Sequence, residues 1–430
     1  MERWSDMAIQ EPDRVAVLES RTPREADRAV DGLGRRVVSN LRWLAISVFV
    51  LSNVLNFLDR QLLAAVAPTL KQTFHLSNTQ YGTLVSAFSL AYALMTPLAG
   101  LFVDRVGLNA GVITAIAMWS AASISTGMAT SFGGLLVSRA SLGLGEACAL
   151  PILSKANASY MRPSEWGLAN AAGSVTLTIG SVAAPLLVAL VAPRYGWRSV
   201  FVISGSLGLL WLALWWFTAR RIPTSGTAAV AGPLVPLRKV LRDRRLLGVA
   251  VAYALVMTVF ILWLNWTTVY LVQVHHLTQT AANRNFAWIP PIFGTLGGLF
   301  SGLLAFRWIR RGADALKARM RICVLCTPLF LITAFIPYLH SASLAIAAIA
   351  VSLFACQGVI GSLNVIPLDL FGPGRAAFSI SLLACAYSLM QTFVSPLIGA
   401  SVDHFGFSAV CTAVAVLPLA GVWILRGTVK

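Results

Sequence analysis

Long apolar stretches alternate with short polar segments along most of this chain. Twelve of these stretches are long enough to cross a bilayer as a helix, which takes about 20 residues. Six precede a polar, basic segment and six follow it, so the pattern predicts an all-α integral membrane protein with twelve transmembrane helices. The spans are expected at residues 43–70, 79–103, 109–130, 133–155, 167–192, 199–219, 247–273, 286–306, 321–340, 343–367, 376–402 and 407–426.

The same pattern divides the chain into four regions. A polar N-terminal tail, residues 1–42, mixes arginine with acids and has no apolar centre, so it predicts a flexible tail and no signal peptide. Residues 43–219 and 247–430 are each expected to form a six-helix bundle. Residues 220–246 are expected to be the loop that joins the bundles.

Composition agrees with the membrane class and explains the strong positive charge. The 430 residues are 57% hydrophobic and only 11% charged, whereas soluble proteins have about 25% charged residues. The net charge of +17 would suggest nucleic acid in a soluble protein, but here the lysines and arginines gather in loops on one side of the predicted spans. We therefore expect no nucleic-acid partner, a multi-pass protein of the inner or plasma membrane, and both termini in the cytoplasm. The basic loop residues are Arg220, Arg221, Arg238, Lys239, Arg242, Arg244, Arg245, Arg307, Arg310, Arg311, Lys317 and Arg319.

An internal sequence repeat links the two halves. Residues 96–107 read TPLAGLFVDRVG and residues 395–406 read SPLIGASVDHFG, with the proline, the Asp and two glycines in the same places. These segments form the ends of the second and eleventh spans, and the two ends are expected on opposite sides of the membrane. That relation is typical of inverted three-helix repeats within each bundle.

Four charged residues lie inside apolar spans of the first half. They are Asp59 and Arg60 in the first span and Arg139 and Glu146 in the fourth. Each charge at mid-membrane costs roughly 2.5–3.5 kcal/mol on insertion-based scales. Asn56 shares a helix face with the first pair, and the second pair is seven residues apart on one face, so all four charges can meet if the two helices face a common cavity.

The charge balance of this group predicts a chemistry. Two cations and two anions sum to zero, and an incoming carboxylate would leave the cavity with one excess negative charge unless a proton came with it. We expect Asp59 and Glu146 to be the proton sites, and Arg60 and Arg139 to bind a carboxylate. The alternative is a static ion-pair network that only holds two helices together.

Three motifs resemble those of a known family. Residues 100–107, GLFVDRVG, are similar to the loop motif between the second and third helices of the major facilitator superfamily, and residues 139–147, RASLGLGEA, resemble its fourth-helix motif. Residues 56–61, NFLDRQ, look like the anion:cation symporter branch, in which the closest likeness is to hexuronate and other sugar-acid proton symporters. The resemblance implies the major facilitator fold, alternating access, and symport of an organic anion driven by a proton gradient with no other cofactor.

The loop motif also implies a conformational latch. Gly100, Asp104, Arg105 and Gly107 are its residues here, with Asp104 expected near the positive N-terminus of a helix. Leu108 stands where the family has basic residues, which would weaken the latch. A solvated loop charge is the simpler interpretation of Arg105.

Uncharged polar residues could complete a substrate site. The second half has no charge in the core of its predicted spans, so it would recognise the rest of the solute while the first half handles protons and the carboxylate. Each polar residue could equally be a hydrogen-bonding contact between helices. The candidates, with Asn56, are Tyr92, Asn265, Asn364, Ser388 and Gln391.

Other activities find little support in the sequence. Cys323 and Cys326 form a CxxC with no histidine or second CxxC nearby, so no metal site is expected, and no phosphate-binding glycine loop is present. We expect no enzymatic activity and a monomer. Two alternatives remain: a proton-driven exporter of lysolipids or drugs, because spinster-like carriers share the Asp-Arg and Gly-x-Gly-Glu-Ala patterns, and a membrane sensor that does not transport.

Overall fold

A computed structural model describes residues 23–160, 166–220, 243–371 and 373–429 of the chain. These residues are almost entirely helical, and the predicted all-α membrane fold is confirmed. Eleven of the described helical segments are long and apolar enough to span a membrane. The last of them, Leu382–Thr428, is 47 residues long and contains the twelfth predicted span and most of the eleventh.

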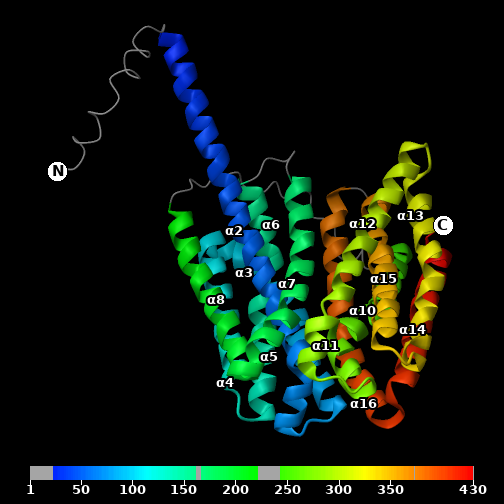
Figure 1. Cartoon of the computed structure of the whole chain (residues 1–430). Helices are drawn as coiled ribbons and strands as arrows, with labels where there is room; N and C mark the ends of the chain where they lie inside the picture. The colour runs from blue at the N-terminus through cyan, green and yellow to red at the C-terminus, as the bar shows by residue number, and fades with distance from the viewer. Residues whose placement is uncertain (1–22, 161–165, 221–242, 372, 430) are drawn as a thin grey trace.

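The helices of the first half lie together on one side of the molecule (Figure 1). Within this group α2 packs on α7 and α8, and α3 packs on α5. Its elements are α2 (Pro23–Phe74), α3 (Asn78–Val106), α4 (Leu108–Met128), α5 (Phe132–Glu146), α6 (Ala149–Tyr160), α7 (Trp166–Tyr195) and α8 (Trp197–Ala219).

The helices of the second half lie beside them (Figure 1). Here α10 packs on α16, and α12 packs on α15. The elements are α10 (Arg244–Val274), α11 (Gln279–Asn285), α12 (Ile289–Arg310), α13 (Ala315–Cys326), η2 (Thr327–Leu331), α14 (Ile332–Phe335), η3 (Ile336–Tyr338), α15 (Ala342–Phe371) and α16 (Pro373–Thr428). The division into two separate bundles stays a prediction.

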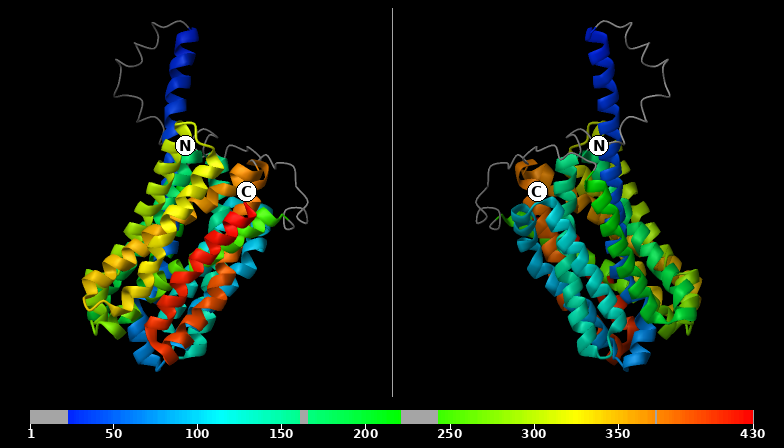
Figure 2. Two further views of the ribbon diagram at one scale, coloured as in Figure 1. Left: turned by 90° about the vertical axis from the view of Figure 1, so that its right-hand side faces the viewer. Right: turned by 90° about the vertical axis from the view of Figure 1, so that its left-hand side faces the viewer.

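The expected flexible tail is wrong for residues 23–42, which continue α2 as helix. Both perpendicular views show this end of α2 extending beyond the other helices (Figure 2). Five of its twenty residues are arginine, which favours helix, and no proline separates the segment from the apolar span that follows. Residues 1–22 and the central segment 221–242 lie outside the described part of the chain.

Glycine and proline mark three of the helix boundaries. Gly406 interrupts α16 with a φ of 71°, a left-handed conformation that favours glycine and that separates the two predicted spans. Gly107 has a φ of 85° and turns the chain from α3 into α4. Pro290 and Pro291 lie in the first turn of α12, where no backbone donor is needed.

The two halves are joined at the end of the molecule opposite the start of α2. At this joined end the Tyr81 hydroxyl donates to the Asn265 carbonyl at 2.7 Å. The Thr69 hydroxyl donates to Gln279 Oε1 at 2.8 Å. Gly82 and Gly399 permit α3 and α16 to touch, since a Cβ at either would overlap backbone of the other helix. These contacts connect the halves away from the middle of the spans, where the four charges lie.

Candidate functional site

Two helices place the four charges at similar depth in the first half. Asp59 and Arg60 lie mid-way along the apolar part of α2, Trp43–Phe74, while Arg139 and Glu146 belong to α5. A Cβ at Gly143 would overlap the Phe88 carbonyl oxygen, so the glycine allows α5 to pack closely against α3. This close approach sets Arg139 and Glu146 against the aromatic residues of α3.

The helix carrying Glu146 ends at that residue. Ala147 and Cys148 form a turn between α5 and α6, and the Cys148 amide bonds the Gly145 carbonyl at 3.4 Å. Pro151 has no N–H to bond the Ala147 carbonyl, which explains a break here. The expected fourth span is therefore two helices, with Glu146 at the break.

Arg60 and Glu146 form the ion pair of the site. Arg60 Nε donates to Glu146 Oε2 at 2.6 Å, with Glu146 fully buried and the Arg60 side chain 18% exposed. The guanidinium lies 4.7 Å from the centre of the Tyr92 ring and 5.1 Å from that of Phe88. Aromatic faces stabilise a cation at this distance, so Arg60 is held in place while part of it remains accessible.

Asp59 points elsewhere. Its Oδ1 accepts hydrogen bonds from the hydroxyls of Ser123 on α4 and Ser204 on α8, both at 2.7 Å. The expectation that all four charges meet is therefore only partly met, because adjacent residues on α2 project in different directions. In the part of the chain that the structure describes, no ion pair joins Asp59 to either arginine.

Arg139 is buried and incompletely bonded. It is 3% exposed, and its guanidinium lies 5.0 Å from the centre of the Phe88 ring. Its Nε and Nη1 have no acceptor among the described residues, and Glu146 Oε1 and Asn56 Nδ2 also lack partners there. Buried donors without acceptors are costly, so these atoms are suited to bind a ligand.

The uncharged candidates divide into two groups. Tyr92 lies against Arg60, and Asn364 lies beside the Tyr253 hydroxyl. Gln391 is buried on α16. Asn265 Nδ2 instead donates to Ile261 O at 2.9 Å, and the Ser388 hydroxyl donates to Ala384 O at 3.0 Å. The side chains of Asn265 and Ser388 therefore bond backbone carbonyls of their own helices, as expected for residues with a structural role.

Several residues of the site were missed by sequence reasoning. Tyr387 of α16 lies close enough to Arg60 and Tyr92 for its hydroxyl to interact electrostatically with both. The centre of its ring is 6.3 Å from the centre of the Phe260 ring. Its position next to Ser388, and one turn before Gln391, could have suggested it. No local signal marked Ser123 or Ser204, because serines are common in transmembrane helices.

The predicted latch has a different partner from the expected one. Asp104 Oδ1 lies 3.1 Å from Lys155 Nζ of α6, which also donates to the Val103 carbonyl at 2.9 Å. Among the described residues Asp104 makes no hydrogen bond to the amides of a helix N-terminus, and its role in a latch stays a prediction. Arg105 is exposed, and Gly100 has open space around it.

Asp403, which occupies the position of Asp104 in the second segment of the internal repeat, does lie at a helix N-terminus. Asp403 Oδ1 accepts from the Asn78 amide at 3.0 Å, and its Oδ2 accepts from the Thr79 amide and hydroxyl, both at 2.8 Å. These amides begin α3, where unsatisfied donors and the helix dipole favour an anion. Asp403 thereby ties α16 to α3 at the joined end.

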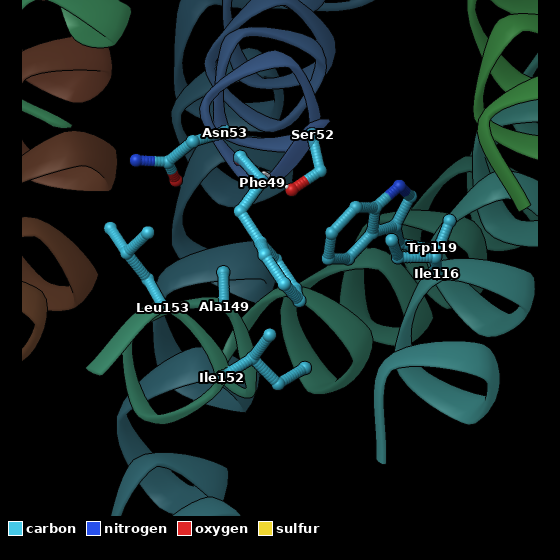
Figure 3. Close-up of a pocket in the computed structure, with 8 residues that line it drawn as sticks. All are labelled: Phe49, Ser52, Asn53, Ile116, Trp119, Ala149, Ile152 and Leu153. Atoms are coloured by element: carbon cyan, nitrogen blue, oxygen red, sulfur yellow. Dashed lines mark hydrogen bonds between the residues drawn. The ribbon is translucent and has the colours of Figure 1, made fainter. Parts of the chain in front are cut away.

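A small cavity lies near the site, between α2, α4 and α6 (Figure 3). Its volume is about 10 Å³, which is room for about one water molecule. Ser52, Asn53 and Trp119 are among the residues that line it. It is too small for an organic solute, which would have to bind on the accessible side of Arg60.

Comparison with known families gives one extended match. The model of the Major Facilitator Superfamily matches residues 49–395, which include all four charges. Among solved structures, a bacterial homologue of the human lysosomal transporter Spinster, in an inward-facing and occupied conformation, superposes with a TM-score of 0.76. That match covers 90% of this chain and 96% of the other at 21% identity, so it shows the fold alone.

Curated relatives share more of the sequence. The hexuronate transporter of Escherichia coli (strain K12) is 28% identical over 412 residues, which is 91% of this chain and 94% of that protein. The galacturonate transporter of Dickeya chrysanthemi is also 28% identical, over 62% of this chain and 82% of its own length.

Proposed function

Because this chain belongs to the Major Facilitator Superfamily, a family of membrane transporters, we propose that it takes up a sugar acid together with at least one proton. The protein is a multi-pass membrane protein. The proposal names the solute class, the coupling ion and the residues that connect them. It places the solute carboxylate at Arg60 and Arg139 and the proton at Glu146.

One observation carries the proposal: a buried arginine with free donors adjoins a buried ion pair. Arg139 has two N–H donors without acceptors in the described chain, and Glu146 uses only one of its oxygens. Guanidinium groups match carboxylates in geometry, and the paired hydrogen bonds are charge-assisted. A carboxylate beside Arg60 would satisfy donors that this chain leaves open.

Coupling to a proton follows from competition for Arg60. The site is neutral when both acids are ionised, because two arginines balance two carboxylates. A solute carboxylate that accepts from Arg60 displaces Glu146 Oε2, and a fully buried carboxylate without a cation binds a proton. Release of the solute restores the Arg60–Glu146 pair and frees the proton on the other side.

Asp59 has a different part in this scheme. Its two serine hydrogen bonds stabilise the charged form without an ion pair. We therefore assign Asp59 to the electrostatic balance of the site, as a second acceptor of a proton only when the serines release it. The sequence alone had treated both acids alike.

The solute class rests on the relatives and on the shape of the site. Two relatives are named for hexuronate and galacturonate transport, and the first of them matches 91% of this chain. Tyr92 and Tyr387 offer hydroxyls beside Arg60, one from each half. Such groups suit the hydroxyls of a sugar acid whose carboxylate is bound to the arginine.

The test is uptake into proteoliposomes that contain the purified protein. An imposed gradient, acid outside, should drive accumulation of labelled galacturonate, glucuronate or galactonate, and a protonophore should abolish it. A matched control is Asp369→Asn, which removes the acid of the ion pair with Arg319 away from the site. If none of the three acids accumulates and the vesicles instead expel lysolipid or a cationic dye, the exporter alternative replaces this proposal.

We also propose that both termini are cytoplasmic. The start of α2 and the last turns of α16 lie toward the same end of the molecule (Figure 1). The basic residues Arg307, Arg310 and Arg311 lie at the C-terminal end of α12, and the positive-inside rule places such residues on the cytoplasmic side. A C-terminal alkaline phosphatase fusion should therefore be inactive, and an active fusion would reverse the orientation.

A further inference from the structure

A wide groove opens on the second half, far from the charged site. It has a volume of about 860 Å³ and lies between the end of α12, one face of α13 and the end of α16. The groove is near the end of the molecule where the chain leaves α16 (Figure 1). Its size is within the range of small-molecule sites, and nothing in the proposed function uses it.

The mouth of the groove is strongly cationic. Lys317, Arg321 and Arg426 line it, all three are exposed, and Asp314 is the acid beside them. Asp314 already accepts from the Lys317 amide as the N-cap of α13. Across the described chain no ion pair joins any of the three cations, whereas Arg319 on the next face of α13 is paired with Asp369 at 2.6 Å.

The helix geometry concentrates these charges. Lys317 and Arg321 are one turn apart on the same face of α13, so two like charges are neighbours with no acid between them. Arg426 approaches from α16. Three cations from two helices thus line one space, where they would attract an anionic group.

The deeper part of the groove is apolar. Met320, Val324 and Leu325 line it one to two turns further along α13, and Val324 and Leu325 are 38% and 55% exposed. At a rise of about 1.5 Å per residue, Leu325 is about 12 Å deeper than Lys317 along the helix. Trp308, a residue type enriched at membrane surfaces, lines the groove from α12.

We propose that this groove binds an anionic phospholipid, with the phosphate at Lys317, Arg321 and Arg426 and an acyl chain along Val324 and Leu325. The division between a cationic mouth and an apolar interior matches the division of a phospholipid into headgroup and chain. The depth agrees as well, since a headgroup region is several ångströms thick and the hydrocarbon begins beneath it. A soluble anion would use the cations but not the exposed apolar wall.

The test measures lipid binding to the full-length protein purified in detergent. Native mass spectrometry with dioleoylphosphatidylglycerol gives the dissociation constant of the first bound lipid, and dioleoylphosphatidylcholine gives the zwitterionic reference. The expected preference for phosphatidylglycerol is about 10- to 100-fold, because three cations each favour the anionic headgroup. Millimolar glycerol 3-phosphate should not displace the lipid, because it lacks the acyl chain.

Two sets of variants separate this site from general surface charge. The triple variant Lys317→Gln, Arg321→Gln, Arg426→Gln should lose the preference. The triple variant Arg244→Gln, Arg307→Gln, Arg311→Gln removes the same charge from exposed residues outside the groove and should keep it. The proposal would be overturned if both triple variants lost the preference for phosphatidylglycerol equally, or if the wild-type protein bound the two lipids with equal affinity.

A third variant tests the acyl wall without changing charge. Leu325→Trp adds bulk at an exposed position and should weaken phosphatidylglycerol binding several-fold while glycerol 3-phosphate binding is unchanged. A photoactivatable group on the acyl chain should label Val324 or Leu325 in the wild-type protein. Labelling confined to distant helices, or displacement of the lipid by glycerol 3-phosphate, contradicts the assignment.

Discussion

Arg60 is partly buried and Arg139 is buried in the same half of the molecule, and the two are bonded differently. Arg60 pairs with Glu146 at 2.6 Å, whereas Arg139 has two donors without acceptors in the described chain. The ion pair makes Arg60 responsive to the charge of Glu146. Because two of its donors lack acceptors, Arg139 would be stabilised more than Arg60 by hydrogen bonds to an incoming carboxylate.

We predict that Arg139→Lys weakens uptake of the sugar acid mainly through KM. A lysine keeps the charge but loses the planar donor pair, which should cost on the order of 1.5–3 kcal/mol, or about 10- to 100-fold in KM. Initial rates of uptake over a range of solute concentrations measure this. Arg284→Lys, at an exposed position on α11, is the control and should leave KM unchanged. A wild-type KM for Arg139→Lys would exclude Arg139 from the carboxylate site.

A second prediction concerns Glu146→Gln. The amide keeps the shape of the side chain but cannot bind and release a proton, so proton-driven accumulation should stop while exchange of internal for external solute continues. Counterflow in preloaded proteoliposomes measures exchange, and accumulation under an acid-outside gradient measures coupling. Unchanged accumulation would remove Glu146 from the proton pathway, and Asp59→Asn would then be the next variant to examine.

Residue identity alone predicted part of this site. Asp59, Arg60, Arg139 and Glu146 stood out because charge is costly in an apolar span, and the structure buries all of them except part of Arg60. The role of each stays a prediction. Ser123, Ser204 and Tyr387 could not be found in the same way, because neutral side chains in a span carry no comparable energetic signal.

At the scale of the elements, helix ends determine how the two halves are tied together. Asp403, at the end of one segment of the internal repeat, bonds the first amides of α3. Asp104, at the corresponding position of the other segment, bonds Lys155 instead. If the repeats exchange roles when the molecule changes conformation, each aspartate would bond a helix N-terminus in only one of the two states.

We predict that Asp403→Asn loosens the joined end. Loss of a charged cap on α3 should cost about 0.5–2 kcal/mol, which corresponds to a roughly 2- to 30-fold rise in amide exchange at the start of that helix. Hydrogen–deuterium exchange of the peptide that contains Asn78 and Thr79 measures this. Asp104→Asn should leave the exchange of this peptide unchanged. An equal effect of both variants would contradict the distinction between the two aspartates.

At the scale of the whole molecule, the two halves touch through backbone. Gly82 of α3 and Gly399 of α16 lie where a side chain would overlap the opposite helix. Hydrogen bonds from Tyr81 and Thr69 reinforce the same end. A contact built on two glycines can be tight in one conformation and be opened without breaking covalent or ionic bonds.

We predict that Gly82→Ala shifts the molecule away from this conformation. Overpacking at a close contact costs roughly 1–3 kcal/mol, which would change the population ratio about 5- to 150-fold. Uptake rates should fall while the protein still inserts and purifies normally, and exchange should rise throughout the first turns of α3. Gly302→Ala, at a position with open space around it, is the control. Normal uptake and exchange in Gly82→Ala would show that this contact does not limit the conformational change.

The sequence by itself determined the helices and the charges that they carry. The bilayer requires about 20 apolar residues in each span. This requirement concerns only consecutive residues, so each span could be found without knowledge of the others. The tertiary structure alone decided which charges pair, because Arg60 and Glu146 are 86 positions apart and Asp59 and Ser204 are 145 apart. Such pairs depend on how helices pack and rotate against one another. That packing is set by glycine contacts and helix breaks, such as Gly143 and the turn at Ala147, whose effect appears only when the neighbouring helix is in place.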